Sequence, residues 1–347
     1  MMFRVLGLSV VLIALVYAAN PEKDRKLSAD ELVEHINKQG KWQATKYEQF
    51  AGKSKEELKQ YLGALKKPSQ MRRKAKPSNI KKLDDVPKSF NAVEAWPQCS
   101  SVIGLIQDQS SCGSCWAVST TSAFSDRLCI ASNATIQKSI SALDLMACCY
   151  DCGYQCQGGY PDSAWDYFTS TGVCTGNNYT DDGGCKPYPI SPCWVDKKTK
   201  KMKCPEEPSD SYTCKKACQS TYKDETYKND HYYGSSTNYF SNENDRAIAD
   251  LVANGPIVAA FDVYEDFYSY KSGIYRYTYG DYVGGHAVRV VGYGEENGVK
   301  YWLVANSWNT IWGENGYFRI VRGTNDCSFE DEFTSGNADV ARSLKGK

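Results

Sequence analysis

The 347-residue sequence is long enough for one large domain or two medium ones, and its 41 basic and 41 acidic side chains cancel in net charge. The cancellation hides a split, because residues 19–85 carry 17 basic and 10 acidic side chains whereas residues 86–347 carry 23 and 31. The basic excess lies outside the main body of the chain, which argues against nucleic-acid binding. It predicts a basic leader that is attracted to an acidic body and held less tightly in acid.

The chain begins with a pattern typical of a secretory signal. Arg4 precedes an apolar run from Val5 to Val16, and small residues favour cleavage after Ala18. The run is too short to span a bilayer, so we expect residues 1–18 to be a signal peptide and the mature protein to have no membrane span. A lysosomal or extracellular destination follows, and the oxidising route makes the 15 cysteines disulfide candidates.

Residues 19–85 are predicted to be a propeptide with two short helices. Two capping boxes, each a Ser followed three residues later by a Glu, place helix starts at Ser28 and Ser54, and Gly40 ends the first helix. Such small helices cannot form a core alone, so we expect them to pack on a larger body. The stretch from Lys66 to Lys82 is rich in basic residues and contains two prolines. It predicts an exposed processing region, with a simple spacer as the alternative.

Residues 86–347 predict an α+β domain. Residues 115–130 are typical of a helix that follows a glycine-rich turn, and residues 145–220 hold ten cysteines in a loop-rich region. The last third predicts strands at Ile257–Val263, Ala287–Tyr293, Tyr301–Ala305 and Tyr317–Val321. A helical half followed by a strand-rich half indicates two lobes with a cleft between them.

The segment Gln109-Ser-Ser-Cys-Gly-Ser-Cys-Trp-Ala117 carries the strongest chemical signal. A nucleophilic cysteine needs a lowered pKa, which a helix N-terminus and a nearby imidazole supply. Cys115 begins the predicted helix and meets the first condition. Two alternatives remain at this point: Cys112 and Cys115 as a redox pair, or both as structural half-cystines. The absence of a βαβ pattern around the pair disfavours the redox alternative.

The same segment resembles the C-G-S-C-W signature of the papain family of cysteine proteases. The resemblance implies that Cys115 attacks the scissile carbonyl and that Gln109 helps to hold the oxyanion. It also implies a papain-like two-lobed fold, with a helical N-terminal lobe, a β-barrel-like C-terminal lobe and a propeptide that blocks the cleft. Peptides and proteins would be the substrates, cystatin-type proteins the inhibitors, and no cofactor or metal would be needed.

The sequence context of one of the three histidines is typical of the base that such a cysteine requires. His35 lies in the leader and His231 in what we expect to be a polar loop, whereas His286 enters a predicted strand. By resemblance, Asn306 orients the imidazole of His286. Trp308 would shield that hydrogen bond from water and border the substrate site.

The cysteine-rich region is similar to cathepsin B, in motifs such as Cys156-Gln-Gly-Gly-Tyr-Pro161 and Gly184-Cys-Lys-Pro-Tyr188. Spacing alone does not choose a disulfide pairing. The resemblance implies the pairs Cys99–Cys129, Cys112–Cys156, Cys148–Cys214, Cys149–Cys152, Cys185–Cys218 and Cys193–Cys204. Cys115, Cys174 and Cys327 are left over, and Cys174 is extra in this chain. A bond between Cys112 and Cys156 would exclude the redox pair.

The resemblance also implies residues that bind substrate. Gly158 and Gly159 would line the cleft with bare backbone. Glu332 would lie at the base of the S2 pocket, where a carboxylate accepts Arg as well as apolar P2 residues; an exposed surface glutamate is the alternative. Sequons at Asn133 and Asn178 predict glycosylation.

One loop departs from cathepsin B. Between Cys193 and Cys204, Val195 and Asp196 replace two adjacent histidines that hold the C-terminal carboxylate of a substrate. The sequence therefore predicts a cysteine endopeptidase made as a zymogen and leaves carboxydipeptidase activity in doubt. The lysines that follow either partly replace the two histidines as a binding site for the carboxylate or form a solvated basic loop. A non-catalytic, disulfide-rich secreted protein on the same fold is the rival interpretation.

Overall fold

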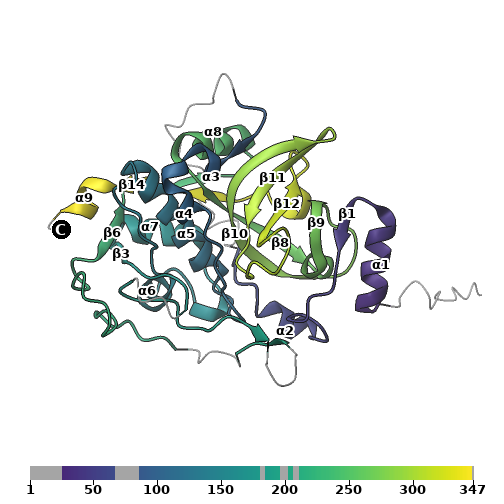
Figure 1. Ribbon diagram of the computed structural model, residues 1–347, viewed down its shortest axis with the longest axis horizontal. Helices are drawn as coiled ribbons and strands as arrows, with labels where there is room; N and C mark the ends of the chain where they lie inside the picture. Colours follow the sequence, from purple (N-terminus) through teal and green to yellow (C-terminus); the bar gives the residue numbers. More distant parts are fainter. Residues whose placement is uncertain (1–25, 67–85, 180–183, 196–201, 206–210, 346–347) are drawn as a thin grey trace, which may run out of the picture.

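The computed structural model describes residues 26–66, 86–179, 184–195, 202–205 and 211–345. The expected signal peptide, nearly all of the basic linker and Asp196 lie outside these residues. Helices occupy one side of the molecule and a large sheet the other, and the leader crosses from the sheet edge to the junction of the two (Figure 1). No helix among the described residues is long and apolar enough to cross a membrane.

The helices are α1 (Ala29–Gln39), α2 (Lys55–Lys59), α3 (Ala92–Ala95), α4 (Ser100–Ile103), α5 (Cys115–Ala131), α6 (Ala142–Cys148), α7 (Pro161–Ser170), α8 (Asn244–Asn254) and α9 (Val340–Leu344), with 3-10 turns at Pro97–Cys99, Gln155–Gln157, Glu265–Ser269 and Asp326–Ser328. Helix α5, predicted from the sequence, is the central one. It is buried around most of its circumference because it packs on α6 and α7 on one side and on the sheet on the other.

The strands are β1 (Trp42–Ala44), β2 (Phe90–Asn91), β3 (Val173–Cys174), β4 (Trp194–Val195), β5 (Met202–Lys203), β6 (His231–Gly234), β7 (Asn238–Phe240), β8 (Ile257–Tyr264), β9 (Tyr270–Tyr275), β10 (Tyr282–Glu296), β11 (Val299–Ala305), β12 (Tyr317–Val321), β13 (Phe333–Ser335) and β14 (Ala338–Asp339). The four strands predicted for the last third are confirmed as β8, β10, β11 and β12. The prediction of a polar loop at His231 is wrong, because this residue begins β6 and pairs with Cys174.

The large sheet follows the order β1-β9-β12-β11-β10-β8-β13-β7, with β2 also paired to β10. In the described part of the chain this path is open at both ends, so the strand-rich lobe is an open sheet and not a closed barrel. Its long central strands β8 and β10 pair antiparallel and lie beside α5. The lobes therefore meet along α5 and β10.

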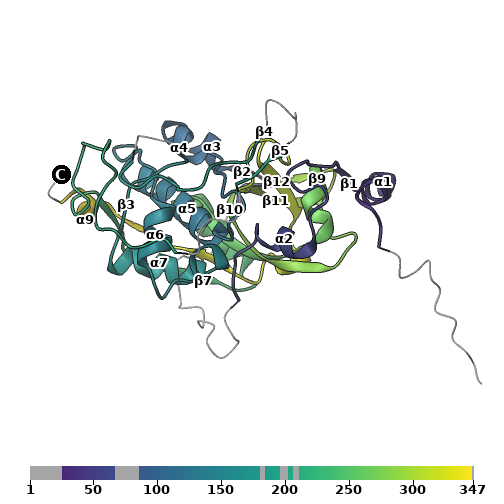
Figure 2. The ribbon, with the colours of Figure 1, turned by 90° about the horizontal axis from the view of Figure 1, so that it is seen from below.

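The leader is docked on the sheet edge. Both capping boxes are present, at Ser28 and Ser54, and Gly40 takes the left-handed conformation that ends α1. Strand β1 pairs antiparallel with β9, and the buried ring of Trp42 packs near Tyr270 and Tyr275. The leader thereby shares the core of the strand-rich lobe (Figures 1 and 2).

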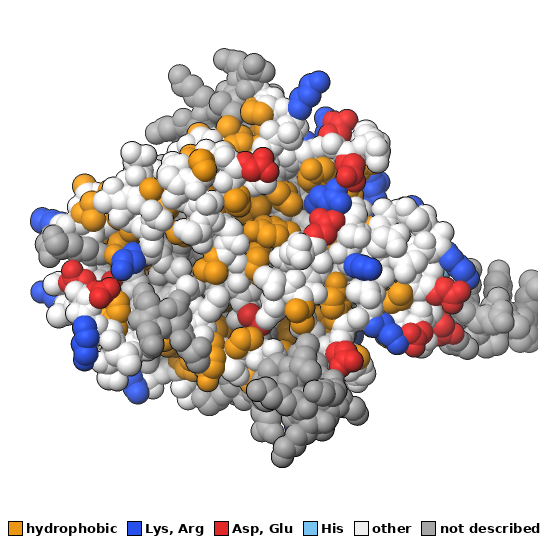
Figure 3. Space-filling model, in the orientation of Figure 1, with side chains coloured by type: hydrophobic (Ala, Val, Ile, Leu, Met, Phe, Trp, Pro, Cys, Tyr) orange, Lys and Arg blue, Asp and Glu red, His pale blue; other side chains and the backbone are white. Residues whose placement is uncertain are grey.

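Charged leader side chains gather at the α1 end of the molecule (Figure 3). The pairs Lys38–Glu34 and Lys46–Asp30 lie at 2.8 and 2.6 Å there. These pairs are exposed and stay within the leader, so they contribute little to its attachment. Apolar packing around β1 holds the leader more firmly than these charges do.

Six disulfides staple the body. They join Cys99 to Cys129, Cys112 to Cys156, Cys148 to Cys214, Cys149 to Cys152, Cys185 to Cys218 and Cys193 to Cys204, the same pairs that the resemblance implied. Cys115, Cys174 and Cys327 are free and buried. With Cys112 tied to Cys156, a dithiol pair between Cys112 and Cys115 is excluded in this structure.

Two adjacent residues of α5 brace the lobes. The buried Arg127 guanidinium binds Asp250 of α8 at 2.7 Å and also donates to the carbonyls of Gly255, Pro256 and Gly336. Asp126 receives two hydrogen bonds from Arg289 of β10, at 2.7 and 2.9 Å. Each ion pair is satisfied on both sides, which buried charges require.

Candidate active site

Cys115 is the first residue of α5, so its thiol lies at a helix N-terminus, where the helix dipole favours negative charge. The side chain is fully buried, and its Sγ accepts a hydrogen bond from the Ala287 N–H at 3.4 Å. Burial raises the pKa of the Cys115 thiol to about 12, although backbone N–H groups, among them those of Ala287, Gly63 and Ala64, oppose the rise. Gly63 and Ala64 belong to the leader. Part of the burial is therefore imposed by the leader.

His286 lies on β10, immediately before the residue that donates to Cys115. Its Nε2 is 2.7 Å from the amide oxygen of Asn306, which also accepts from the Ser307 N–H. Because that oxygen can only accept, Nε2 carries the hydrogen and Nδ1 keeps its lone pair. Nδ1 is buried and has no hydrogen-bond partner in this state. The imidazole is thus in the tautomer that can take a proton on Nδ1.

The surroundings of His286 keep it neutral. Burial lowers the pKa of the imidazole to about 4, against the opposite effect of its hydrogen bond to Asn306. The indole of Trp308 stacks on the ring at a centroid distance of 4.9 Å and an angle of 27°. In the described state burial thus favours the neutral form of both the Cys115 thiol and the His286 imidazole.

Gln109 presents its side-chain amide to the turn that precedes Cys115. Its Oε1 accepts from the Ser307 hydroxyl at 2.5 Å, and its Nε2 donates to the carbonyl of Cys112 at 2.7 Å. The second hydrogen of Nε2 points to the carbonyl of Tyr61, in the leader, at 3.0 Å. A leader carbonyl thus accepts a hydrogen bond from the residue that was predicted to hold the oxyanion. The fixing role of Ser307 was missed in the sequence, where it reads only as the middle of Asn-Ser-Trp.

The leader backbone runs between the walls of the cleft. Gly159 donates its N–H to the carbonyl of Gly63 at 2.8 Å and accepts from the N–H of Leu65 at 2.9 Å, in a parallel bridge centred on Ala64. On the other wall, Ala64 donates to the carbonyl of Gly285 at 3.0 Å. Substrate backbone and this segment cannot occupy the cleft together.

Glycine is required where the leader crosses the turn at Gly113, just before Cys115. A Cβ added to Gly63 would lie 1.8 Å from the carbonyl oxygen of Gly113. Gly113 is equally confined, because its own Cβ would meet the carbonyls of Cys156 and Leu62 at 2.3 and 2.7 Å. The backbone pass expected at Gly113 is therefore present, and two glycines face each other there.

The remaining sequence-predicted residues fall around this centre. Gly158 has a φ of +103°, which favours glycine, and its Cα faces Leu65 of the leader. Glu332 is half-buried directly before β13, and its carbonyl accepts from the Ala260 N–H of β8. Val195 pairs with Met202 in the short β4–β5 hairpin inside the Cys193–Cys204 disulfide. Its neighbour Asp196 lies outside the described residues.

The two sequons differ in exposure. Asn133 is exposed at the end of α5, with a positive φ of 50°. Asn178 is half-buried, and its side-chain oxygen is enclosed without a hydrogen-bond partner. Asn133 is therefore the more accessible of the two predicted glycosylation sites.

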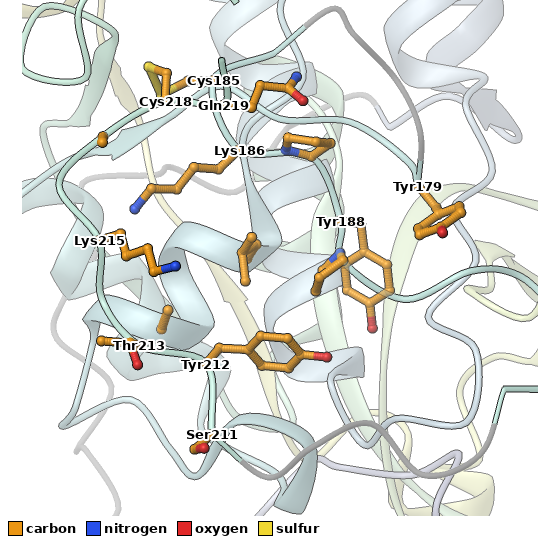
Figure 4. Close-up of a pocket in the computed structure, with 15 residues that line it drawn as sticks. Tyr179, Cys185, Lys186, Tyr188, Ser211, Tyr212, Thr213, Lys215, Cys218 and Gln219 are labelled. Atoms are coloured by element: carbon orange, nitrogen blue, oxygen red, sulfur yellow. A yellow bond between two sulfur atoms is a disulfide. The ribbon is translucent and has the colours of Figure 1, made fainter. Parts of the chain in front are cut away.

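A separate pocket lies beside the oxyanion segment. Figure 4 shows Tyr188 and Tyr212 on its wall, with Lys215 across from them and the Cys185–Cys218 disulfide at its rim. The hydroxyl of Tyr188 donates to the carbonyl of Gln109 at 2.8 Å and shares a hydrogen bond with Ser114. Tyr188 ends the Gly184–Tyr188 motif, but its contact with Gln109 was not predicted; it holds the backbone that carries Gln109.

Cys174 is near the sulfur of Cys185 and the carboxylate of Asp230, with all three ligand atoms within 4.8 Å. Cys185 is in a disulfide, however, and Asp230 already accepts from Thr175. A thiolate from Cys185 is unavailable for coordination. We assign no metal to this cluster.

Comparisons with known proteins agree with the geometry. The model of the family described as "Papain family cysteine protease" matches residues 86–337. The chain belongs to this family. It is 42% identical to the cathepsin B-like cysteine proteinase 6 of Caenorhabditis elegans over 90% of this chain and 83% of that protein. It is 41% identical to the cathepsin B-like cysteine proteinase of Schistosoma japonicum over 96% and 97%.

A solved structure, that of procathepsin B S9 from Trypanosoma congolense, superimposes with a TM-score of 0.74 at 36% identity, covering 90% of this chain and 99% of that one. Procathepsin L 3 of Tenebrio molitor is more distant, with a TM-score of 0.62 at 24% identity over 88% and 86%, and shows the fold alone. The protein is therefore a cathepsin B-like cysteine peptidase of the papain fold, described here with its propeptide in place.

Proposed function

We propose that the protein is a cathepsin B-type endopeptidase in which Cys115 is the nucleophile, His286 the general base and acid, Asn306 the group that orients the imidazole, and Gln109 an oxyanion donor. The observation that carries the proposal is the leader itself. Its backbone contacts the Cys115 thiol, while a carbonyl of the same segment accepts from Gln109. A peptide in that place therefore lies within reach of both Cys115 and Gln109.

The reaction follows from the protonation states. Nδ1 of His286 takes the thiol proton from Cys115, and the thiolate attacks the carbonyl carbon while Gln109 donates to the developing oxyanion. The imidazolium then gives its proton to the departing amine, leaving an acyl-enzyme. Water, deprotonated by the same imidazole, hydrolyses the thioester and releases the acid.

Acid is proposed to open the zymogen through His286. Its pKa is about 4 in the closed state, below the ordinary value of 6.5, because the cleft is dry. If the pKa rises when the leader leaves, the open state binds the extra proton. Acid therefore favours opening as the pH falls from about 6.5 toward 4. The leader's Lys26 lies 2.9 Å from Asp281 and lowers its pKa, so this exposed pair is lost only at lower pH, when Asp281 is protonated.

The domain limits and destination complete the proposal. Residues 1–18 would be a signal peptide and 19–85 the propeptide, with the mature chain beginning near Val86 and the enzyme reaching lysosomes or the outside of the cell. Glycans would be attached at Asn133 and Asn178. Cystatin-type proteins would inhibit the mature enzyme by entering the cleft that the leader leaves.

Endopeptidase action is proposed over carboxydipeptidase action, because Val195 and Asp196 supply no imidazole to bind a C-terminal carboxylate. Glu332, at the end of the cleft wall formed by β8 and β13, would accept Arg at P2. We expect Glu332→Ala to slow cleavage of peptides with Arg at P2 and to leave cleavage of peptides with an apolar P2 residue unchanged. Equal cleavage of one peptide with a free and with an amidated C-terminus would support the endopeptidase assignment.

The decisive experiment is active-site labelling of the acid-activated protein with a thiol-directed epoxide. Labelling should occur at Cys115, abolish peptide hydrolysis, and disappear in His286→Ala. A folded protein that is processed but neither labels nor cleaves peptides would favour the non-catalytic rival.

A further inference from the structure

A lysine of the leader is bound to a carboxylate inside the cleft. Lys66 Nζ lies 2.6 Å from Oδ1 of Asp262, on β8. Lys66 follows directly on the segment Gly63–Leu65 that pairs with the cleft glycines. The Asp262 side chain is only 17% exposed in this state. The cleft thus binds the basic side chain of Lys66 through Asp262, a residue to which the sequence analysis assigned no role.

Asp262 is built into the wall that contacts bound peptide. In the β8–β10 register it lies opposite Gly285, whose carbonyl binds the N–H of Ala64. Gly285 directly precedes His286. A peptide held by Gly285, as Ala64 is, therefore passes within side-chain reach of Asp262.

The backbone of a second acidic residue, Glu332, is bound to the same strand. Ala260 lies two residues before Asp262 on β8, so both side chains point to the same face, about 7 Å apart. Ala260 donates its N–H to the carbonyl of Glu332. The backbone of Glu332, the expected base of the S2 pocket, thus joins β8 two residues before Asp262.

Tyrosines complete the surroundings of Asp262. Tyr264 and Tyr282 pair across β8 and β10, with ring centroids 6.0 Å apart. Burial, together with the nearby Asp262 carboxylate, raises the pKa of Tyr282. Aromatic faces beside a carboxylate suit the stem and the charge of Lys or Arg.

We propose that Asp262 is a specificity residue of the mature enzyme, which binds a Lys or Arg side chain of the substrate at the place where the leader's Lys66 is bound in the zymogen. This rests on the proposed endopeptidase function and deepens it. Substrates would be peptides with a basic residue near the scissile bond, on the same side of it as the residue that meets Glu332. Peptides with two basic residues there engage both carboxylates.

The test compares the acid-activated wild type with Asp262→Asn, which keeps the shape and removes the charge. Asp281→Asn is the matched control, because Asp281 is a carboxylate of the same lobe that also pairs with a leader lysine but lies outside the cleft. Peptides that carry Arg or its neutral isostere citrulline at P1, P2 or P3 are cleaved in parallel with an apolar peptide. The readout is the ratio of kcat/KM for Arg over citrulline at each position.

We expect Asp262→Asn to lower this ratio about 3- to 5-fold at one position, the upper range for a partly exposed ion pair, and Asp281→Asn to leave it unchanged. The wild-type ratio should also fall as salt is raised, which tests the proposal without any variant. Ratios that stay within twofold in Asp262→Asn at every position overturn the proposal and leave Asp262 as a contact of the leader alone. Failure of the wild type to cleave even the apolar peptide would instead refute the proposed function.

Discussion

The glycine at position 63 makes a sharp test of how the leader blocks the enzyme. In Gly63→Ala the added Cβ would lie 1.8 Å from the Gly113 carbonyl oxygen and 2.4 Å from its carbon, whereas contacts below 3.0 Å are essentially unknown for real Cβ atoms. The atoms it meets are backbone, braced by the Cys112–Cys156 disulfide next to them. The leader must therefore move by more than 1 Å.

Such a movement breaks the pairing that holds the segment in the cleft. The bonds at risk are Gly159 N–H to Gly63, Leu65 N–H to Gly159, and Ala64 N–H to Gly285, at 2.8 to 3.0 Å. Each contributes about 1 kcal/mol net, so losing two or three costs about 2–3 kcal/mol. At 1.4 kcal/mol for each factor of ten, the open fraction of the zymogen should rise roughly 30- to 150-fold.

The open fraction can be read from the rate at which a thiol reagent labels Cys115 in the unprocessed zymogen at neutral pH, because the closed thiol is buried. Gly52→Ala is the control. Gly52 lies in the same leader and has a φ of +73°, but nothing lies within 4 Å of an added Cβ. Its substitution costs about 1 kcal/mol of leader stability with no clash. If Gly63→Ala labels no faster than Gly52→Ala, the leader does not cross the cleft as described.

Three further outcomes follow from the same structure. With only three histidines in the chain, labelled imidazoles can be followed by NMR in a Cys115→Ser zymogen: we expect His286 to stay neutral to about pH 4, and a midpoint near 6.5 would contradict its burial. Asn306→Ala should lower kcat of the mature enzyme about 10- to 100-fold with little change in KM, because the imidazole loses the group that fixes its tautomer. A similar fall in kcat/KM that came from a higher KM alone would argue for a role in binding. Arg127→Ala leaves the buried Asp250 carboxylate without its cation, so the free energy of unfolding measured by denaturation should fall by about 3–5 kcal/mol. Arg246→Ala, at a more exposed pair, should lower it by about 0–1 kcal/mol.

The sequence singled out the candidate reacting groups, because the proposed chemistry dictates their residue types and their local sequence context. A nucleophilic Cys115 was expected at a helix N-terminus because that position lowers the pKa of a thiol, and Gly113 before it indicated a turn. Asn306 and Trp308 lie two residues apart, so one motif revealed both. In the structure Cys115 begins α5, Asn306 lies within hydrogen-bond distance of His286, and Trp308 stacks on the same imidazole; their catalytic roles stay predictions.

The supporting groups could not be predicted, because their contacts join distant parts of the chain. Ser307 binds a side chain 198 residues earlier, and Tyr188 binds Gln109 across 79 residues. No local pattern marks Ser307 as a partner of Gln109, and the Gly184–Tyr188 motif does not indicate which residue Tyr188 contacts. Asp262 reads as one acidic residue among apolar ones in a strand, and only its ion pair with Lys66 marks it. His231 was misplaced for the same reason, since its pairing partner Cys174 lies far away in sequence.

The braces on α5 bear on how this zymogen is activated. Asp126 and Arg127 are neighbours in sequence, yet one is tied to β10 and the other to α8 and to the backbone at Gly336. The helix that carries Cys115 is therefore locked to the strand that carries His286 at a distance that does not depend on the leader. Activation can then proceed by release of the leader segment Tyr61 to Lys66, while the two buried ion pairs continue to hold helix and strand together. The timing of activation would then depend on how long that one short segment stays in the cleft.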